Sequence, residues 1–186
     1  ALGGIVRHVI PPFRIGDEAV GNDVKLVLSM GAKVVLNTEV REVRSLFAQG
    51  YTHVILATGA WSKGSAGLEY GEARNVIAFL EQAKKAPETL DLGENVVVIG
   101  GGNTAMDAAR AAVRLPGVKR VSLVYRRTRR YMPADQEELE LALSDGVEFR
   151  ELLAPVGVKD GVLTCREMEL GPPDATGRRS PVDTGR

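Results

Sequence analysis

The clearest candidate for ligand chemistry is a glycine-rich stretch, Gly100-Gly101-Gly102-Asn103-Thr104-Ala105. It follows the apolar run Val96–Ile99 and leads into an alanine-rich segment, a context that predicts a strand, a tight turn and a helix. Gly100 permits the turn, Gly102 leaves room beside the backbone, and Ala105 lets the helix pack closely on the strand. The unpaired amides at the start of this helix would face an anion, so the stretch is expected to hold the pyrophosphate of a dinucleotide.

Two arginines follow the next expected strand, Val121 to Tyr125. In sites specific for NAD, an Asp or Glu at this position binds the ribose 2′-hydroxyl. Here the strand continues into Arg126 and Arg127. Guanidinium groups carry a permanent charge and planar donors that match phosphate oxygens. The sequence therefore predicts a cofactor with a 2′-phosphate, NADPH, and places Arg126 and Arg127 at that phosphate.

Plainer interpretations of both features stay open. The glycines could serve only to turn the chain, although three in a row cost about 0.5 to 1 kcal/mol each in regular structure, which disfavours a mere turn. The arginines could belong to a solvated loop, because arginine is common on protein surfaces. A dinucleotide-binding or sensing module without catalysis is therefore the alternative to an oxidoreductase.

The glycine stretch requires supporting elements on both sides. A helix is expected at about Asn75 to Lys85, and a parallel strand–helix–strand unit at Val96 to Tyr125. A further helix should run from Pro133 to about Ser144 and stop at Asp145-Gly146. From Val147 to Val182 short strands and turns predict a β-meander. The fold class is α/β, with a Rossmann-like dinucleotide-binding domain that includes this meander.

The first third of the chain follows a similar pattern. Asp17 offers an N-cap for an amphipathic helix that Gly31 would close. The β-branched runs Lys33–Leu36 and His53–Ala57 predict buried strands of a parallel sheet. Small residues then loosen the chain, and we expect a domain boundary within about 60–75. Residues 1–70 are therefore interpreted as part of a second α/β domain, and 71–186 as the NAD(P)H-binding domain.

Composition restricts the function classes. The chain has 24 basic and 24 acidic side chains, and its arginine cluster lacks interleaved aromatic residues, which argues against a nucleic-acid partner. A single cysteine and two histidines provide no spaced ligand set for a metal. No apolar run approaches the roughly 20 residues of a membrane span. A reducing, cytoplasmic location is expected. The first residue is Ala1, and we interpret the chain as a piece of a longer protein.

Other polar residues carry structural expectations. His53 is expected to be structural at the start of its strand, and Cys165 to be a packed or partly exposed thiol. Asp107 and Arg110 lie three residues apart on one helix and are expected to pair. An acidic run is expected on a solvated helix face, formed by Asp135, Glu137, Glu138, Glu140 and Glu151. No catalytic side chain is nominated, because hydride transfer needs aligned rings.

Three motifs also carry a resemblance to a known family. At Gly100 to Asp107, Val124 to Arg127 and Met132 to Ala134 the chain resembles the small-subunit family of NADPH-dependent glutamate synthase. Dihydropyrimidine dehydrogenase and selenate reductase-type flavoproteins are also similar. The last are the most similar, through Gly3 to Val6, Pro11 to Ile15, Leu115 to Val118 and Asp145 to Phe149. The resemblance spans nearly the whole chain.

The resemblance implies a parent NADPH-dependent flavoprotein in which an NADPH domain interrupts an FAD domain. Residues 1–70 would be part of that FAD-type domain, with Ala57-Thr58-Gly59 as the crossover motif at the flavin edge. Electrons would pass from NADPH to FAD and through iron–sulfur clusters in the full-length protein. The chain has one dinucleotide loop and no cysteines for a cluster. We therefore expect it to be inactive alone and to need those FAD-domain and iron–sulfur segments as partners. Without them we expect self-association or local disorder in residues 1–60.

Overall fold

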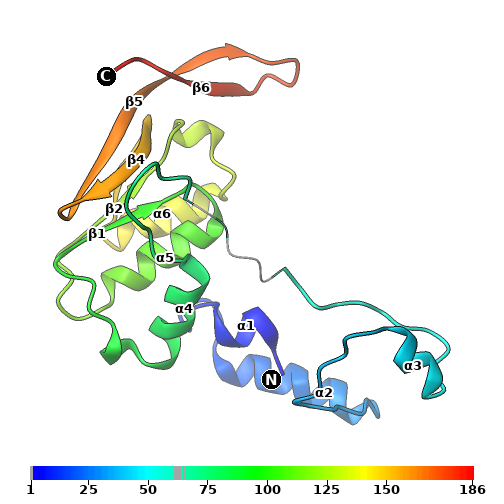
Figure 1. The fold of residues 1–186 in the computed structure, drawn as a ribbon. Coiled ribbons are helices and arrows are strands. Elements are labelled where there is room, and N and C mark those ends of the chain that lie inside the picture. Colours follow the sequence, from blue (N-terminus) through cyan, green and yellow to red (C-terminus); the bar gives the residue numbers. More distant parts are fainter. Residues whose placement is uncertain (1, 61–63, 65) are drawn as a thin grey trace.

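The computed structural model describes residues 2–60, 64 and 66–186 (Figure 1). The elements, in order, are α1 (Gly4–His8), α2 (Asp17–Ser29), α3 (Arg44–Ala48), α4 (Val76–Lys85), η1 (Pro87–Thr89), β1 (Asn95–Ile99), α5 (Asn103–Val113), β2 (Arg120–Val124), η2 (Arg129–Tyr131), α6 (Gln136–Ser144), β3 (Glu148–Arg150), β4 (Leu153–Lys159), β5 (Val162–Pro173) and β6 (Arg179–Asp183). The predicted glycine stretch thus joins β1 to α5, and the two arginines follow β2.

A three-stranded parallel sheet with the order β1-β2-β3 lies beneath α5 and α6. Ile99 is the partner of Val124, so the carboxyl ends of β1 and β2 lie at the same edge. The parallel strand–helix–strand unit is confirmed. The prediction of a meander from Val147 onward is wrong at its start, because β3 pairs in parallel with β2. A strand of three residues has too little pattern to distinguish the two arrangements.

The core forms where α5 packs on the sheet. Alanines at the helical repeat let α5 approach β1 and β2, and Met106 and Leu123 are completely buried between them. Phe79 and Leu80 of α4 cover the other side of α5. The Asn75 side chain caps α4 by accepting hydrogen bonds from the amides of the second and third helical residues. Close packing of small and large side chains of this kind fixes the helix position.

The antiparallel sheet β4-β5-β6 forms the meander that the sequence predicts. It continues from the parallel sheet, because the Leu153 amide donates to the Tyr125 carbonyl at 3.1 Å. Tyr70 adds an isolated parallel bridge at Gly157, whose missing Cβ leaves room for the tyrosine ring. The segment before α4 is thereby attached to the meander.

The first third of the chain differs from the prediction. The helix α2 is present, but Gly16 is its N-cap and Asp17 is its first residue. Residues 33–36 and 53–57 form no strand, and all but the half-buried Val54 are exposed, with Val35 at 75% and Ile55 at 90%. A strand needs a neighbouring strand to satisfy its backbone, and no described segment of this chain lies beside them. His53 is correspondingly exposed, and its ring contacts the hydroxyl group of the neighbouring Thr52.

The segment before α2 packs against the core, whereas the segment directly after α2 is exposed. Val9 is 2% exposed and belongs to the core cluster that contains Phe79 and Leu80. The contacts of α1 with α4 place this short segment against the body of the molecule. Figure 1 shows the chain that follows α2, residues 30–60, extending away from that body. The domain division at about residue 70 remains a prediction.

Candidate dinucleotide site

The glycine stretch is shaped by three different constraints. Gly100 has a φ of 140°, which disfavours other residues, and its amide donates to the Val124 carbonyl. A Cβ on Gly100 would lie 3.4 Å from the Ala105 Cβ, so a small residue at both positions lets α5 approach the strand. A Cβ on Gly102 would meet no atom within 4 Å. This side of the backbone is therefore open to a ligand.

Gly101 has a role that the sequence analysis did not recognise. A Cβ on Gly101 would lie 2.5 Å from the ring of Tyr125, which is itself 8% exposed. The Tyr125 hydroxyl donates to the Tyr131 carbonyl at 2.9 Å. Tyr125 thus packs the end of β2 onto the glycine stretch and holds η2. The signal in the sequence was an aromatic residue at the strand end, opposite a glycine.

The start of α5 leaves hydrogen-bond donors unused. The Gly102 carbonyl accepts from the amides of Ala105 and Met106, and Gly102 supplies no side-chain cap. Within the described part of the chain, the amides of Gly102, Asn103 and Thr104 donate to no acceptor. Amides in the first turn of a helix carry a partial positive charge and favour an anion. The predicted pyrophosphate position fits this arrangement.

The two arginines after β2 lie in different environments. Arg126 is exposed, whereas Arg127 is 8% exposed and its Nε is buried without a hydrogen-bond partner among the described residues. The Arg127 carbonyl accepts from the Leu152 amide at 3.2 Å, which fixes its backbone. A buried, unpaired charged donor costs about 1 to 3 kcal/mol or more. A guanidinium group with a free donor is chemically suited to an anionic group.

A second contact ties the glycine stretch to α6. The Asn103 Nδ2 donates to an Asp135 carboxylate oxygen, and the Asp135 amide donates to the Asn103 Oδ1, both at 3.0 Å. The Ala134 amide donates to the Gly101 carbonyl. The Asn103 side chain is therefore bonded to the N-cap residue of α6, and its backbone amide remains available to a ligand. An open hollow beside this contact is bordered by Arg129, Arg130, Met132, Ala134, Asp135, Gln136 and Leu139.

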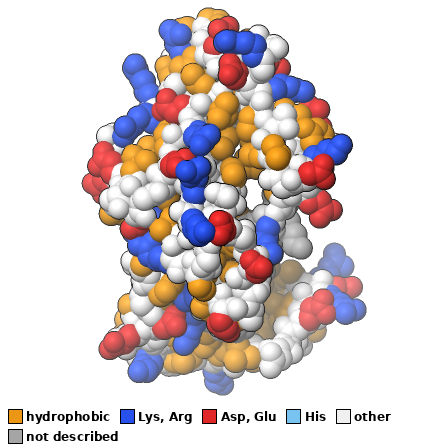
Figure 2. All heavy atoms as spheres, turned by 90° about the vertical axis from the view of Figure 1, so that its left-hand side faces the viewer, with side chains coloured by type: hydrophobic (Ala, Val, Ile, Leu, Met, Phe, Trp, Pro, Cys, Tyr) orange, Lys and Arg blue, Asp and Glu red, His pale blue; other side chains and the backbone are white. Residues whose placement is uncertain are grey.

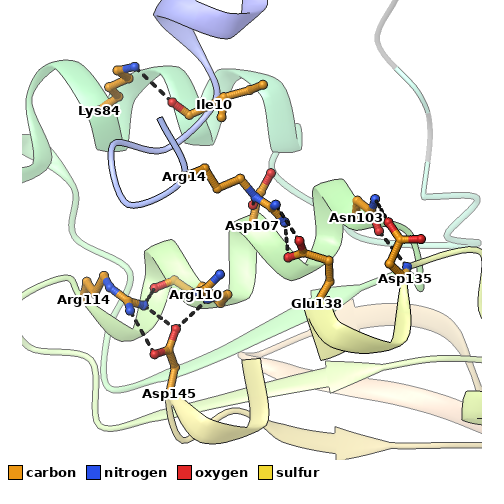
Figure 3. A network of polar contacts seen from close by, with 10 residues as sticks. All are labelled: Ile10, Arg14, Lys84, Asn103, Asp107, Arg110, Arg114, Asp135, Glu138 and Asp145. Carbon is orange, nitrogen blue, oxygen red and sulfur yellow. Dashed lines mark hydrogen bonds and ion pairs between the residues drawn. The ribbon is translucent and has the colours of Figure 1, made fainter. Parts of the chain in front are cut away.

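Ion pairs between the helices differ from the expected ones. Asp107 pairs with Arg14, and Arg110 pairs with Asp145 (Figure 3). The prediction of an Asp107–Arg110 pair is wrong, because each side chain finds a partner outside its own helix. Hydrogen bonds from Arg114 and Arg110 lower the pKa of Asp145 to about 2.

The acidic run is not simply a solvated face. Glu138 accepts hydrogen bonds from Arg14, Asp135 contacts Asn103, and Glu151 accepts from the Arg129 amide. Three of the acidic side chains therefore hold other segments, and that prediction is wrong for them. Charge runs reveal the number of carboxylates but not which cations the fold brings to them.

Other predicted site residues lie apart. Ala57, Thr58 and Gly59 are exposed, belong to no helix or strand, and lie on the segment outside the body of the molecule in Figure 1. Cys165 is partly buried and burial raises its pKa, which fits the expected packed thiol. Within the described ranges, no cluster of His, Cys, Asp or Glu could hold a metal.

A family model now gives these features a context. The pyridine nucleotide-disulphide oxidoreductase model matches residues 16–160, which include the glycine stretch, both arginines and the parallel sheet. The chain belongs to this family. YgfK of Escherichia coli (strain K12) is 46% identical over 187 residues, which cover 98% of this chain and 18% of YgfK.

The resemblance to glutamate synthase small chains is confirmed. The NADPH glutamate synthase small chain of Escherichia coli (strain K12) is 36% identical over 200 residues, covering 96% of this chain and 42% of that protein. The chain thus spans less than half the length of these relatives. The structure of FprA from Mycobacterium tuberculosis in complex with NADPH matches with a TM-score of 0.68 and 19% identity over 98% of this chain and 58% of FprA. That likeness confirms the predicted α/β fold.

Surface properties add two findings. None of the helices in the described ranges combines the length and apolar character of a membrane span. Figure 2 shows acidic and basic side chains interspersed on the face that it presents, without a broad surface of one sign. Charge on this face is balanced locally, in line with the formal net charge of zero.

Proposed function

We propose that the chain binds NADPH at the shared carboxyl edge of β1 and β2. The proposal is carried by hydrogen-bond donors that have no acceptor among the described residues. These are the first amides of α5 and the buried Nε of Arg127. Pyrophosphate oxygens suit the amides, and a 2′-phosphate suits the guanidinium group. Gly102 leaves the approach to the backbone open, and exposed Arg126 supplies a second cation for the 2′-phosphate.

The proposed reaction belongs to the whole protein. Its relatives and the resemblance favour an oxidoreductase in which hydride passes from NADPH to FAD, followed by electron transfer through iron–sulfur clusters. The flavin supplies a hydride acceptor when bound. Ala57, Thr58 and Gly59 would lie at its edge. The residues of this chain hold and orient the dinucleotide, so their contribution to rate is positional, and no side-chain acid or base is required.

Calorimetric titration of the chain with NADPH and with NADH tests the binding proposal. A charged hydrogen bond contributes about 1.5 to 3 kcal/mol, so NADPH should bind roughly ten- to a hundredfold more tightly than NADH. Equal affinities for NADPH and NADH would contradict the proposed role of the arginines. If neither cofactor binds, the proposed site is wrong. If the whole protein binds NADPH but never oxidises it, the sensing alternative holds.

Two arginine variants separate the contributions. Arg127→Met keeps an apolar stem but removes the charge, and it should abolish most of the preference for NADPH over NADH. Because the Nε of Arg127 lacks a partner, this variant should keep or gain stability towards urea. The exposed Arg126→Met should reduce the preference less. A larger effect at Arg126 would reverse the assignment.

The exposed segment after α2 carries a proposal about partners. Exposed apolar side chains gather on the last turns of α2 and on this segment, including Leu26, Val27, Met30, Val35 and Leu56. We propose that other FAD-domain segments of the whole protein cover them, and that without such cover two copies of this chain associate through them. Sedimentation should then show mass that rises with concentration, whereas a monomer at all concentrations would contradict this. A reducing, cytoplasmic location suits the free thiol of Cys165.

A further inference from the structure

Arg14 lies between the two helices that border the proposed site. Its Nε donates to Asp107 of α5, and its two terminal nitrogens donate to the two carboxylate oxygens of Glu138 on α6, one of them at 2.7 Å (Figure 3). The side chains are mostly shielded from solvent, at 24% exposure for Arg14, 12% for Asp107 and 16% for Glu138. A planar guanidinium group can make all three bonds at once, which a lysine cannot.

These bonds form one side of a closed ring of contacts. On α5, Asp107 lies one turn after Asn103, and on α6, Glu138 lies one turn after Asp135. Asn103 and Asp135 exchange two hydrogen bonds at the other side of the ring. Arg14 therefore fixes the spacing and rotation of the same two helices whose first turns meet at the glycine stretch.

The segment that carries Arg14 is itself held in place. The Phe13 ring lies under the guanidinium groups of Arg110 and Arg114, each 4.6 Å from the ring centroid. Lys84 donates to the Ile10 carbonyl at 3.0 Å, which ties the segment to α4 as well. An arginine on an anchored segment can set a helix position, whereas one on a free segment would follow the helices.

Electrostatics makes the position sensitive to the arginine. Burial raises the pKa of the Asp107 carboxyl, and the hydrogen bond from Arg14 opposes that rise. Without Arg14, the carboxyl groups of Asp107 and Glu138 would lose the guanidinium group that joins them, and the polar link between the two helices at this point would be lost.

We propose that Arg14 is a positioning residue for the dinucleotide, which acts by holding α5 and α6 so that the first amides of α5 face the pyrophosphate. The inference rests on the proposed NADPH site. It predicts that Arg14 affects ligands through their pyrophosphate. The affinity for ligands that bind only the arginines after β2 should not depend on Arg14.

The test compares two ligands on the 186-residue chain. NADP⁺ contains the pyrophosphate, and adenosine 2′-monophosphate contains only the 2′-phosphate end. Arg14→Gln should weaken NADP⁺ binding about tenfold, as misplacement of a supporting residue typically does, and should leave adenosine 2′-monophosphate within about twofold. Arg14→Lys should restore part of the NADP⁺ affinity. Arg41→Gln is the matched control, because Arg41 also pairs with a carboxylate but is 82% exposed.

A double-mutant cycle with Asn103→Ala sharpens the test. If Arg14 and Asn103 act through the same contact between the helices, the double variant should bind NADP⁺ about as weakly as the single variant with the lower affinity. Should Arg14→Gln fail to fold, Glu138→Gln weakens the same link while keeping the Arg14–Asp107 bond, and it should show the same ligand selectivity.

The outcomes separate the two proposals. If the unsubstituted chain binds neither ligand, the proposed function fails. If it binds both and the Arg14 and Glu138 variants bind NADP⁺ equally well, or lose both ligands in parallel, the positioning role is contradicted. Additive effects of Arg14→Gln and Asn103→Ala would also contradict it.

Discussion

The body around α5 and the segment after α2 have similar sequence patterns but different structures. Val96–Ile99 and His53–Ala57 are both short apolar runs followed by a glycine within a few residues. The first is a paired strand beneath two helices, and the second is exposed chain. The difference lies in their neighbours, because β1 has β2 beside it and helix α5 above it. An apolar run is thus a strand only where the chain supplies its partners.

The largest expected difference between the regions concerns methionine packing. Met106 on α5 has no exposed surface, whereas Met30 at the end of α2 is 79% exposed. Met106→Ala should lower the free energy of unfolding by about 2 to 5 kcal/mol, and Met30→Ala by less than about 0.5 kcal/mol. Urea denaturation of both variants measures this. Equal losses would mean that α2 packs as tightly as α5.

A pair of glycine substitutions gives the next effect. A Cβ at Gly101 would collide with the Tyr125 ring, so Gly101→Ala should cost about 1 to 3 kcal/mol. Gly21 lies within α2, where a Cβ would meet no atom within 4 Å. Gly21→Ala should therefore stabilise the helix by up to about 1 kcal/mol. Thermal unfolding of the two variants should shift in opposite directions, and a harmless Gly101→Ala would contradict the Tyr125 contact.

A smaller effect should depend on pH. The pKa of Asp145 is held at about 2, below its ordinary 3.8, by Arg114 and Arg110. A carboxyl whose pKa falls on folding stabilises the protein above its unfolded pKa, and this stability disappears as pH falls through the folded value. Asp145→Asn should therefore cost about 1 to 2 kcal/mol at pH 7 and only a small part of that near pH 2.

The control for the pH prediction is Asp23→Asn on α2, where Asp23 is exposed. It should leave the free energy of unfolding unchanged at both pH values. If Asp145→Asn costs the same at pH 7 and pH 2, the loss comes from packing and the ion pair contributes little. Urea midpoints at several pH values distinguish these cases.

Much of the body could be predicted because its signals are local. Three glycines between an apolar run and an alanine-rich run predicted the β1–α5 turn, and the helix predicted at about Asn75 to Lys85 matches α4. The parallel pairing of β3 was not predicted, because its three residues carry too little pattern to distinguish it from a meander strand. The strands predicted at 33–36 and 53–57 failed for a different reason, since their pattern was typical but their partners are not in the described structure.

Within the candidate site, the sequence predicted residue types better than contacts. The glycine stretch and the arginines were found from spacing, but no sequence feature distinguished Arg126 from Arg127. Only the fold shows that Arg127 is buried and Arg126 exposed. The pairing of Arg14 with Asp107 and Glu138 joins residues 93 and 124 positions apart. Contacts over such separations follow from topology and leave no local signal.

The most direct test of the account is a map of backbone amide shifts on titration of the chain with NADP⁺. If this edge of the parallel sheet binds the dinucleotide, we expect the largest shifts at Gly102, Asn103, Thr104 and Arg127, and none along residues 33–57. Shifts confined to residues 33–57, or absent from the first turn of α5, would contradict the claim that this edge of the parallel sheet is the dinucleotide site.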